Sequence, residues 1–156
     1  MSLINSSIEK HYSNSNIYER ILARLKEQGV DLDRITRNDL AGVDEFHVRG
    51  AEVSLELAEQ IGLNNTTKVL DVGCGIGGPA RMLAETYGCK VTGIDLTADY
   101  VEAAELLSEH LGLQDLTQFM QANALELPFE DSSFDVVWTQ HVQMNVENKK
   151  QMYGEI

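Results

Sequence analysis

Little positive charge, few cysteines and no long apolar run set the first limits on this chain. Its 12 basic residues stand against 25 acidic ones, and the net charge of −13 repels nucleic-acid phosphates and anionic membrane surfaces. The only neighbouring basic pair is Lys149 and Lys150. We therefore expect neither a nucleic-acid partner nor a membrane partner.

The two cysteines, Cys74 and Cys89, are too few for a disulfide framework and lack a C-x-x-C spacing. No metal is expected, because no metal-ligand spacing relates the cysteines to His11, His47 or His110. The first residues contain no apolar stretch typical of a signal peptide, and no run approaches the roughly 18 apolar residues of a membrane span. These absences predict a reduced, cytoplasmic protein.

A length of 156 residues with 43% hydrophobic and 24% charged side chains fits one domain with a packed core. Apolar residues at three- and four-residue spacing predict a helix over 17–26, which Gly29 ends, and a second helix over 53–61. Between them, Val30 to Glu45 lacks periodicity and is expected to be irregular, with at most one helical turn. The best internal boundary lies here.

We expect residues 1–45 to form an amino-terminal helical lid segment and residues 46–156 to form the main domain. Tyr12 and the stretch from Phe46 to Gly50 are candidates for a cover over a bound ligand. Ordinary packing is the more common role of such residues, and it stays the alternative.

From Lys68 onward, strand patterns alternate with helix patterns. Helices are predicted over 79–87 and 98–111, the second with Thr97 as its cap and Gly112 as its stop. The predicted strands cover residues 68–72, 90–95, 117–121 and 134–139. Strands that alternate with helices indicate an α/β fold with a parallel sheet and right-handed crossovers.

The segment from Asp71 to Pro79 joins the first predicted strand to the next helix, where a doubly wound sheet binds a nucleotide-like ligand. Gly73 and Gly75 permit a tight turn and close approach of a ligand to the backbone. Together with Gly78 they also satisfy the G-x-G-x-x-G dinucleotide fingerprint, and Asp95 lies where its ribose-binding acid belongs. NAD is therefore a serious candidate ligand.

Asp71 favours a different ligand. It lies inside the end of a strand, two residues before the first glycine, where a dinucleotide site usually has an apolar residue. Burying a carboxylate is costly unless it is paired or hydrogen-bonded. S-adenosylmethionine carries an amino group and a sulfonium that would attract this carboxylate, whereas Asp95 could bind the ribose hydroxyls of either ligand.

Several short motifs follow one another in a characteristic order: Val69-Leu-Asp-Val-Gly-Cys-Gly, Gly77-Gly-Pro-Ala-Arg81, Gly93-Ile-Asp-Leu, Leu127-Pro-Phe and Ser133-Phe-Asp-Val-Val-Trp138. In this order they closely resemble class I S-adenosylmethionine-dependent methyltransferases that act on small molecules. The most similar branch contains sarcosine/dimethylglycine, phosphoethanolamine, tocopherol and ubiquinone/menaquinone methyltransferases. The resemblance covers residues 66–156 well and residues 11–65 only loosely.

This resemblance implies a Rossmann-like doubly wound parallel sheet, S-adenosylmethionine as cofactor, and a small-molecule acceptor such as an amine or a quinone-like ring. The methionine end of the cofactor would lie at the glycine turn, with the ribose and adenine beside the end of the second strand. The implied cofactor-binding residues are Asp71, Gly73, Cys74, Gly75, Asp95, Leu96, Asn123, Ala124 and Gln140. Many relatives have Asp in place of Asn123, whose side-chain oxygen can still accept a hydrogen bond from the adenine amino group.

His141 is the one candidate for a catalytic base or an acceptor-orienting group, and a structural or exposed histidine is the alternative. Cys74 has no companion base and is not expected to act as a nucleophile. A catalytic triad is not required, because alignment of the reactants can supply about 7–11 kcal/mol, against roughly 3–5 kcal/mol from a positioned base.

Because the related fold has seven strands, this chain is expected to be an amino-terminal fragment truncated to about four strands, in the order 3-2-1-4. The strand over 134–139 would then lie at an open edge, and we expect another copy of the chain, a swapped segment or further polypeptide to cover it. Two alternatives to an active methyltransferase stay open: an NAD-dependent oxidoreductase fragment, and a cofactor-binding or dimerising domain without activity.

Overall fold

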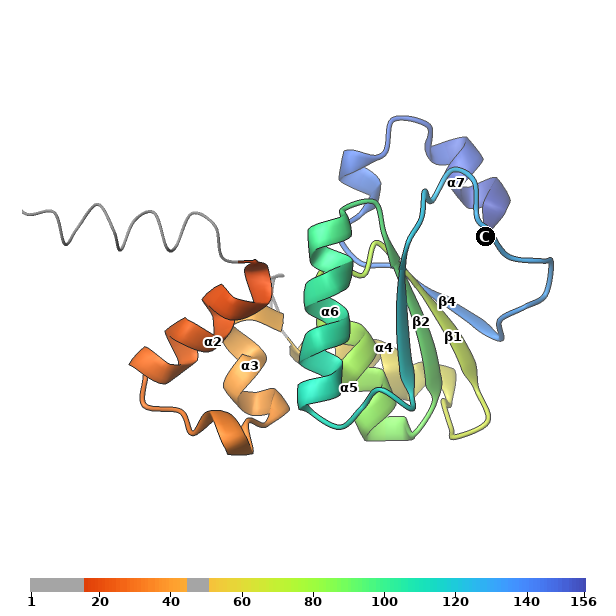
Figure 1. Cartoon of the computed structure of the whole chain (residues 1–156). Coiled ribbons are helices and arrows are strands. Elements are labelled where there is room, and N and C mark those ends of the chain that lie inside the picture. Colours follow the sequence, from red (N-terminus) through yellow and green to blue (C-terminus); the bar gives the residue numbers. More distant parts are fainter. Residues whose placement is uncertain (1–15, 45–50) are drawn as a thin grey trace, which may run out of the picture.

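A parallel β-sheet of four strands forms the centre of the computed structural model, which describes residues 16–44 and 51–156 (Figure 1). The strands are β1 (Lys68–Val72), β2 (Lys90–Asp95), β3 (Thr117–Gln121) and β4 (Val136–Trp138). Their order is β3-β2-β1-β4, and every neighbouring pair is parallel. The predicted Rossmann-like α/β fold is confirmed, although β4 is shorter than the strand predicted over 134–139.

Side chains of each strand alternate between the two faces of the sheet. Val69 and Val91 are buried on one face together with Phe119 of β3, whereas Leu70 and Ile94 are buried on the other. The central strand β1 is buried at every position from Val69 to Val72, and these residues are apolar except for Asp71, as a strand covered on both faces requires.

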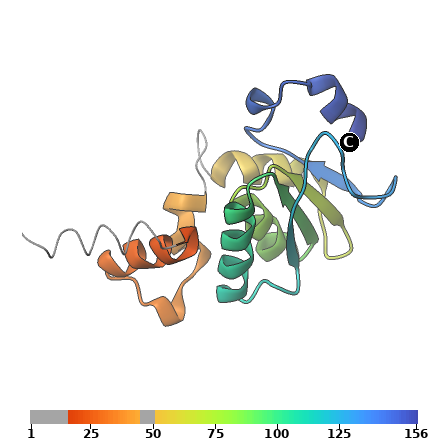
Figure 2. The ribbon, with the colours of Figure 1, turned by 45° about the horizontal axis from the view of Figure 1, so that its top comes forward.

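Helices cover both faces of the sheet (Figure 2). The helices α4 (Ala51–Ile61), α5 (Gly78–Tyr87) and α6 (Ala98–His110) contribute to the buried cluster on the face of Val69. On the opposite face lies α7 (Lys149–Glu155), which follows the short 3-10 helix η2 (Gln143–Asn145). Its Met152 is fully buried against Leu70 and Val72, so the last helix is anchored to the centre of the sheet.

Local sequence fixes the ends of the central helices. Gly77, with φ +82°, precedes α5, Pro79 lies in its first turn, and Gly88 with φ +70° ends it. Thr97 occupies the predicted cap position of α6, but its side chain makes no capping hydrogen bond. The helix therefore begins where the sequence predicts, although the Thr97 side chain does not cap it.

The amino-terminal part forms α2 (Ile17–Glu27), the 3-10 helix η1 (Leu32–Arg34) and α3 (Arg37–Asp44). The prediction of an irregular connection between Val30 and Glu45 was wrong for α3. The backbone N–H of Thr36 donates to Asp39 Oδ2 at 2.8 Å, and the Asp39 N–H donates to the Thr36 carbonyl at 3.1 Å. A threonine followed three residues later by an acid is a capping-box signal that could have revealed this helix.

The amino-terminal helices pack on α6. Leu40 of α3 joins Ile21 and Leu25 of α2 in a cluster with Leu107 of α6. At the end of α6, His110 Nδ1 lies 2.9 Å from the Tyr18 hydroxyl, and its Nε2 lies 2.7 Å from the Leu32 carbonyl. Because a carbonyl can only accept, Nε2 carries a hydrogen, and His110 has a structural role.

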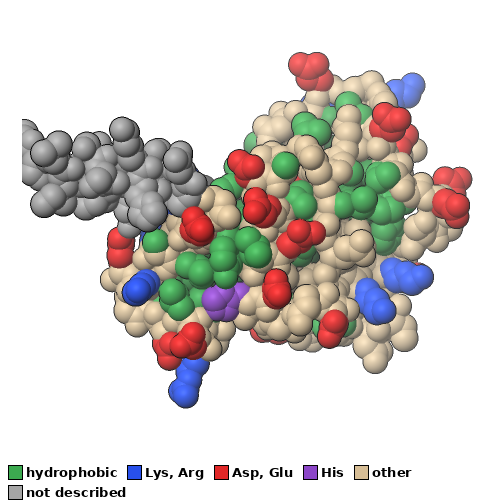
Figure 3. Space-filling model, in the orientation of Figure 1, with side chains coloured by type: hydrophobic (Ala, Val, Ile, Leu, Met, Phe, Trp, Pro, Cys, Tyr) green, Lys and Arg blue, Asp and Glu red, His purple; other side chains and the backbone are tan. Residues whose placement is uncertain are grey.

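The surface reflects the acidic composition of the chain. Figure 3 shows Asp and Glu side chains scattered over the displayed face, with Lys and Arg in fewer places. Three acids of α6, Glu102, Glu105 and Glu109, are all exposed. Within the described ranges, no helix is both long and apolar enough to cross a lipid bilayer.

A buried ion pair joins α3 to α5. Arg81, which has no exposed surface, binds the carboxylate of Asp44 and donates to the carbonyl of Ile76 at 2.7 Å. A Cβ at Gly78 would overlap the backbone carbonyl of Asp44, so glycine is required there for this close approach. The pair therefore ties the amino-terminal helices to the segment that follows β1.

Replacing Asp44 by alanine should lower the free energy of unfolding by about 3–5 kcal/mol, because the Arg81 guanidinium would remain buried without its partner. The double variant Asp44→Leu with Arg81→Met should recover most of this loss, since it leaves no buried charge. Urea denaturation of the three proteins measures both effects.

Glu85→Gln is the matched control, because it removes the charge of a carboxylate that contacts Arg37 at 2.7 Å and is itself 48% exposed. Its cost should stay below about 1 kcal/mol, as is usual for solvent-exposed pairs. Equal losses in Asp44→Ala and Glu85→Gln would contradict the anchoring role of the buried pair.

Candidate functional site

A cavity of about 700 Å³ lies at the carboxyl ends of the strands, the usual ligand position in doubly wound sheets. The chain runs from β1 outward through β2 to β3 and then returns to place β4 on the other side of β1, so the topology switches beside this cavity. Eight of the predicted site residues line it: Gly73, Gly75, Asp95, Leu96, Asn123, Ala124, Gln140 and His141. The sequence motifs and the cavity therefore converge on one place.

The glycine turn after β1 is bound to the end of β2. The backbone N–H groups of Gly73 and Cys74 both donate to the Ile94 carbonyl, at 2.8 and 2.9 Å. Gly75 has φ +54°, and a Cβ there would meet no atom within 4 Å. Its backbone is therefore open to a ligand in the cavity, as glycine at this position allows.

Asp95 is oriented by two backbone donors. Its Oδ2 accepts a hydrogen bond from the Gly75 N–H at 3.0 Å, and its Oδ1 accepts one from the Thr97 N–H at 2.9 Å. Each carboxylate oxygen can accept two hydrogen bonds, so one site on each oxygen is left for a ligand. This geometry suits a vicinal diol such as the two hydroxyls of a ribose.

Asp71 lies beneath the cavity rather than in its lining, and only 2% of its surface is exposed. Its Oδ2 makes no hydrogen bond within the described part of the chain. Burial, together with the negative charge of Asp95, raises the pKa of Asp71 from 3.8 to about 7. A buried, unpartnered carboxylate beside the turn is the kind of strained group that a nearby cation would stabilise.

Cys74 is also buried and does not line the cavity. Burial and the neighbouring charges of Asp71 and Asp95 raise the pKa of its thiol well above the ordinary range. Its Sγ lies 2.9 Å from the position that a Cβ at Gly93 would occupy, so the side chain fills the space left by a glycine of β2. Its contacts are those of a packing residue, consistent with the prediction that it is no nucleophile.

Leu96, Asn123 and Ala124 line the part of the cavity beyond Asp95. Leu96 is 69% exposed, which leaves an apolar surface for a flat ring. Asn123 Oδ1 already accepts a hydrogen bond from the Leu125 N–H at 3.0 Å. An amide oxygen has two lone pairs, so Asn123 could still accept from an amino group, but with less freedom to reorient.

Gln140 and His141 follow β4. The Gln140 side-chain oxygen accepts hydrogen bonds from the Trp138 indole N–H at 3.1 Å and from the Ser54 hydroxyl at 3.2 Å. His141 is exposed and has φ +56°, a conformation that residues other than glycine rarely adopt. Such backbone strain is common where a loop must present a side chain to a functional site.

Several lining residues were not predicted from the sequence. They are Ile94, Thr97, Tyr100, Ala122, Leu125, Val142, Asn145, Val146 and Glu147. Their common signal is position: most follow a strand within a few residues at the carboxyl edge of the sheet. No cavity-lining residue comes from 16–44, and Tyr12 and Phe46 to Gly50 lie outside the described residues, so the lid role of the amino-terminal segment stays a prediction.

Comparison with known families identifies the class of protein. Residues 70–156 match the family described as methyltransferase domain, which covers more than half of the chain. The chain belongs to this methyltransferase family.

Curated relatives extend the comparison. A sterol 24-C-methyltransferase from Gibberella zeae is 39% identical over 100 residues, which are 64% of this chain and 26% of that protein. The chloroplastic tocopherol O-methyltransferase of Arabidopsis thaliana is 32% identical over 152 residues, which are 95% of this chain and 44% of the relative. The chain thus spans less than half of either relative.

Solved structures share the fold. Geranyl diphosphate methyltransferase in complex with SAM superimposes with a TM-score of 0.65 at 27% identity, covering 76% of this chain and 47% of the other. The [4+2]-cyclase SpnF superimposes with a TM-score of 0.64 at 28% identity, covering 67% and 38%. The same fold therefore occurs in enzymes that are named for different reactions.

Asp71→Asn tests the strained carboxylate. The folded state holds the Asp71 proton more tightly than the unfolded state, so this group stabilises the fold at low pH and the benefit disappears as pH rises from about 4 through about 7. The free energy of unfolding of Asp71→Asn does not contain this loss. The difference between the variant and the wild type should therefore change by about 2–3 kcal/mol in favour of the variant when the pH is raised from about 5 to about 8. Urea denaturation at both pH values measures the gain, and a constant difference would contradict the raised pKa.

Gly73→Ala tests how closely the loop after β4 covers the glycine turn. A Cβ at Gly73 would overlap the Val142 side chain, whereas one at Gly29 would meet nothing within 4 Å. Both glycines have positive φ, +74° and +83°, so the backbone strain is similar and Gly29→Ala is the matched control. We expect Gly73→Ala to cost about 1–3 kcal/mol more in thermal or urea unfolding. Equal costs would show that Val142 does not pack on the turn.

Proposed function

We propose that this protein binds S-adenosylmethionine in the 700 Å³ cavity and transfers its methyl group to a small-molecule acceptor. The observation that carries the proposal is the pairing of Asp95 with the open glycine turn, held together by the Gly75 N–H. Membership of the methyltransferase family supports this ligand over NAD, which the glycines alone would also fit.

The residues present fit the parts of this cofactor. Asp95 would accept hydrogen bonds from the ribose hydroxyls, and exposed Leu96 would pack on the adenine. Asn123 and Ala124 would lie beside the adenine amino group. The methionine end would lie on Gly73 and Gly75, with the buried carboxylate of Asp71 attracting its amino group and sulfonium from below.

When bound, S-adenosylmethionine supplies an electrophilic methyl group that a nucleophilic atom of the acceptor can attack in line. The protein contributes mainly by positioning, since well-aligned reactants can gain about 7–11 kcal/mol. The glycine turn and Asp95 would fix the donor, and the loop after β4 would shape the space for the acceptor. His141 lines that space and is the candidate to orient or deprotonate the acceptor.

The acceptor we propose is a small organic molecule, with an amine or a quinone-like ring as the leading classes. The relatives named above act on sterol and tocopherol according to their names, which supports small-molecule methylation as the broader class. The chain spans less than half of these relatives. Contacts between the acceptor and the remaining part of such a protein are therefore proposed as well.

Calorimetric titration tests the ligand. S-adenosylhomocysteine should bind and NAD should not. Asp95→Asn should weaken S-adenosylhomocysteine by about tenfold or more, because it removes a charged acceptor of the ribose hydroxyls. Asp115→Asn, at the opposite end of the sheet, is the control and should bind like the wild type. Binding of NAD without S-adenosylhomocysteine would overturn the proposal and favour an oxidoreductase.

A second function is favoured by the cyclase that shares the fold of this chain. In this alternative the protein binds the cofactor without transferring the methyl group. Production of S-adenosylhomocysteine from S-adenosylmethionine over a panel of amine and quinol acceptors distinguishes the two. Turnover above the acceptor-free rate supports the transferase, whereas tight binding with no turnover on any acceptor supports the binding domain.

We also propose that the open edge of the sheet associates with a second copy of the chain. The edge strand β4 pairs only with β1 in the described structure, and a cavity of about 520 Å³ beside it is lined by Leu70, Phe129 and Val137. Sedimentation should then detect a dimer that Val137→Lys disrupts, and a stable monomer would contradict it.

The cellular compartment is a separate proposal. The buried free thiols of Cys74 and Cys89 support a protein that acts in a reducing compartment such as the cytoplasm.

A further inference from the structure

Gln140 is held by two donors that come from different parts of the fold. Trp138, at the end of β4, donates its indole N–H to Gln140 Oε1 at 3.1 Å. Ser54, on α4, donates its hydroxyl to the same oxygen at 3.2 Å. Both donors are buried, with 4% of Trp138 and none of Ser54 exposed. One side-chain oxygen therefore joins the end of the sheet to a helix of the covering layer.

These contacts fix which end of the amide faces each neighbour. An indole N–H can only donate, so the group 3.1 Å away from it must be the amide oxygen and not the amide nitrogen. Two donors use both lone pairs of that oxygen. The NH2 group, which makes no hydrogen bond to another described residue, is the part of Gln140 left for a ligand in the cavity that Gln140 lines.

The loop that follows Gln140 lies against the glycine turn. The Val142 side chain, two residues further on, contacts Gly73 so closely that a Cβ there would overlap it. Gln140, Val142 and Gly73 line the same cavity, so this contact places the loop of Gln140 at the end of the cavity where the turn lies. In the proposed function, on which this inference rests, that end receives the amino-acid part of the cofactor.

We propose that Gln140 binds the carboxylate of the methionine part of the cofactor through its NH2 group, and that Trp138 and Ser54 are positioning residues that hold the amide in this orientation. The division of charge supports it. Asp71 would attract the positive groups of the ligand at the turn, and the negative charges of Asp71 and Asp95 would repel its carboxylate, so the carboxylate needs neutral donors on the other side. A side-chain amide supplies two of them.

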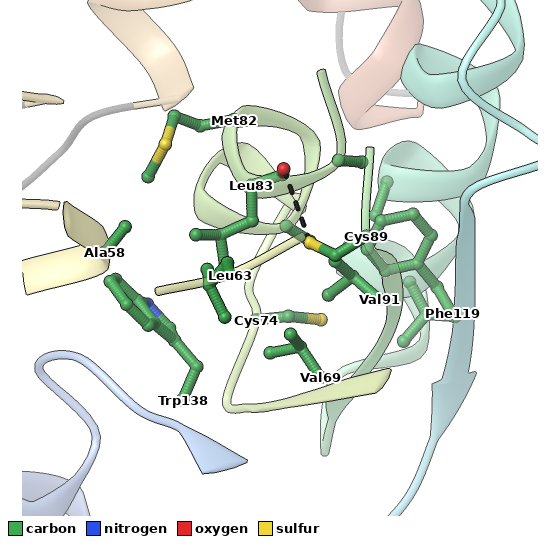
Figure 4. Packing of buried hydrophobic residues seen from close by; sticks show 14 residues of the cluster. Ala58, Leu63, Val69, Cys74, Met82, Leu83, Cys89, Val91, Phe119 and Trp138 are labelled. Carbon is green, nitrogen blue, oxygen red and sulfur yellow. Dashed lines mark hydrogen bonds between the residues drawn. The ribbon is translucent and has the colours of Figure 1, made fainter. Parts of the chain in front are cut away.

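The arrangement also links cofactor binding to the position of α4. Trp138 belongs to the buried cluster that contains Ala58 of α4, and Figure 4 shows the indole on the side of the cluster toward Ala58. A shift of α4 that removed the Ser54 hydroxyl would leave Gln140 with one fixed contact. Binding of the carboxylate by a correctly oriented amide therefore favours the state in which α4 is packed against the sheet.

Gln140→Glu tests the inference with a nearly isosteric change. The glutamate can still accept from Trp138 and Ser54, but it replaces the NH2 group by a negative oxygen that repels a carboxylate. Two probes are titrated by calorimetry: S-adenosylhomocysteine, which has the amino-acid end, and methylthioadenosine, which lacks it. The affinity for S-adenosylhomocysteine should fall by about tenfold or more, while that for methylthioadenosine should change by less than about twofold.

Positioning by Ser54 is tested in the same way. Ser54→Ala should weaken S-adenosylhomocysteine by about two- to fivefold and leave methylthioadenosine unchanged, and Ser54→Thr, which keeps the hydroxyl, should restore the affinity. Gln118→Glu is the charge-matched control, because Gln118 is exposed near the opposite end of the sheet. It should leave the affinities for both probes unchanged.

The outcomes separate this inference from the proposed function. If wild-type protein binds S-adenosylhomocysteine and Gln140→Glu weakens both probes equally or neither, Gln140 does not hold the carboxylate and only the inference is overturned. If wild-type protein binds neither probe, the proposed function is overturned together with it. Selective loss of S-adenosylhomocysteine in Gln140→Glu supports both.

Discussion

The hydrogen bonds that tie the glycine turn to the end of β2 are the constraint on which the site depends. Two successive N–H groups, of Gly73 and Cys74, converge on the Ile94 carbonyl, and the next glycine binds the Asp95 carboxylate. These hydrogen bonds join the turn after β1 to the carboxyl end of β2 and leave the Gly75 backbone open to the cavity. The helix α5 then begins at once, and its Arg81 both caps the turn at Ile76 and anchors α3 through Asp44.

Stability and function oppose each other at this turn. Asp71 is buried with an unsatisfied oxygen, and His141 adopts a left-handed backbone conformation beside the cavity. Each of these two features costs free energy. A cationic ligand would offset the first cost. Broken local rules that gather beside one cavity are typical of binding sites.

Much of the fold could be predicted from the sequence, because strand patterns alternate with helix patterns from Lys68 onward and the central strand β1 is a mainly apolar run buried on both faces. The helix α3 was missed because its local capping signal at Thr36 was overlooked, while its packing depends on contacts distant in sequence, Leu40 with Leu107 and Asp44 with Arg81. In the site, the turn and Asp95 follow from a motif. Val142 and the Ser54 contact to Gln140 depend on how separate segments meet, which no local pattern encodes.

The most direct test of a cofactor seated on the glycine turn is an NMR titration of isotope-labelled protein with S-adenosylhomocysteine. The backbone amide signals of Gly75 and Thr97 should move together with that of Asn123, because their groups meet at Asp95 and along the cavity wall. Signals at the opposite end of the sheet, such as Gln118, should stay in place. Shifts confined to that opposite end, or no shifts at saturating ligand, would contradict the assignment of this cavity.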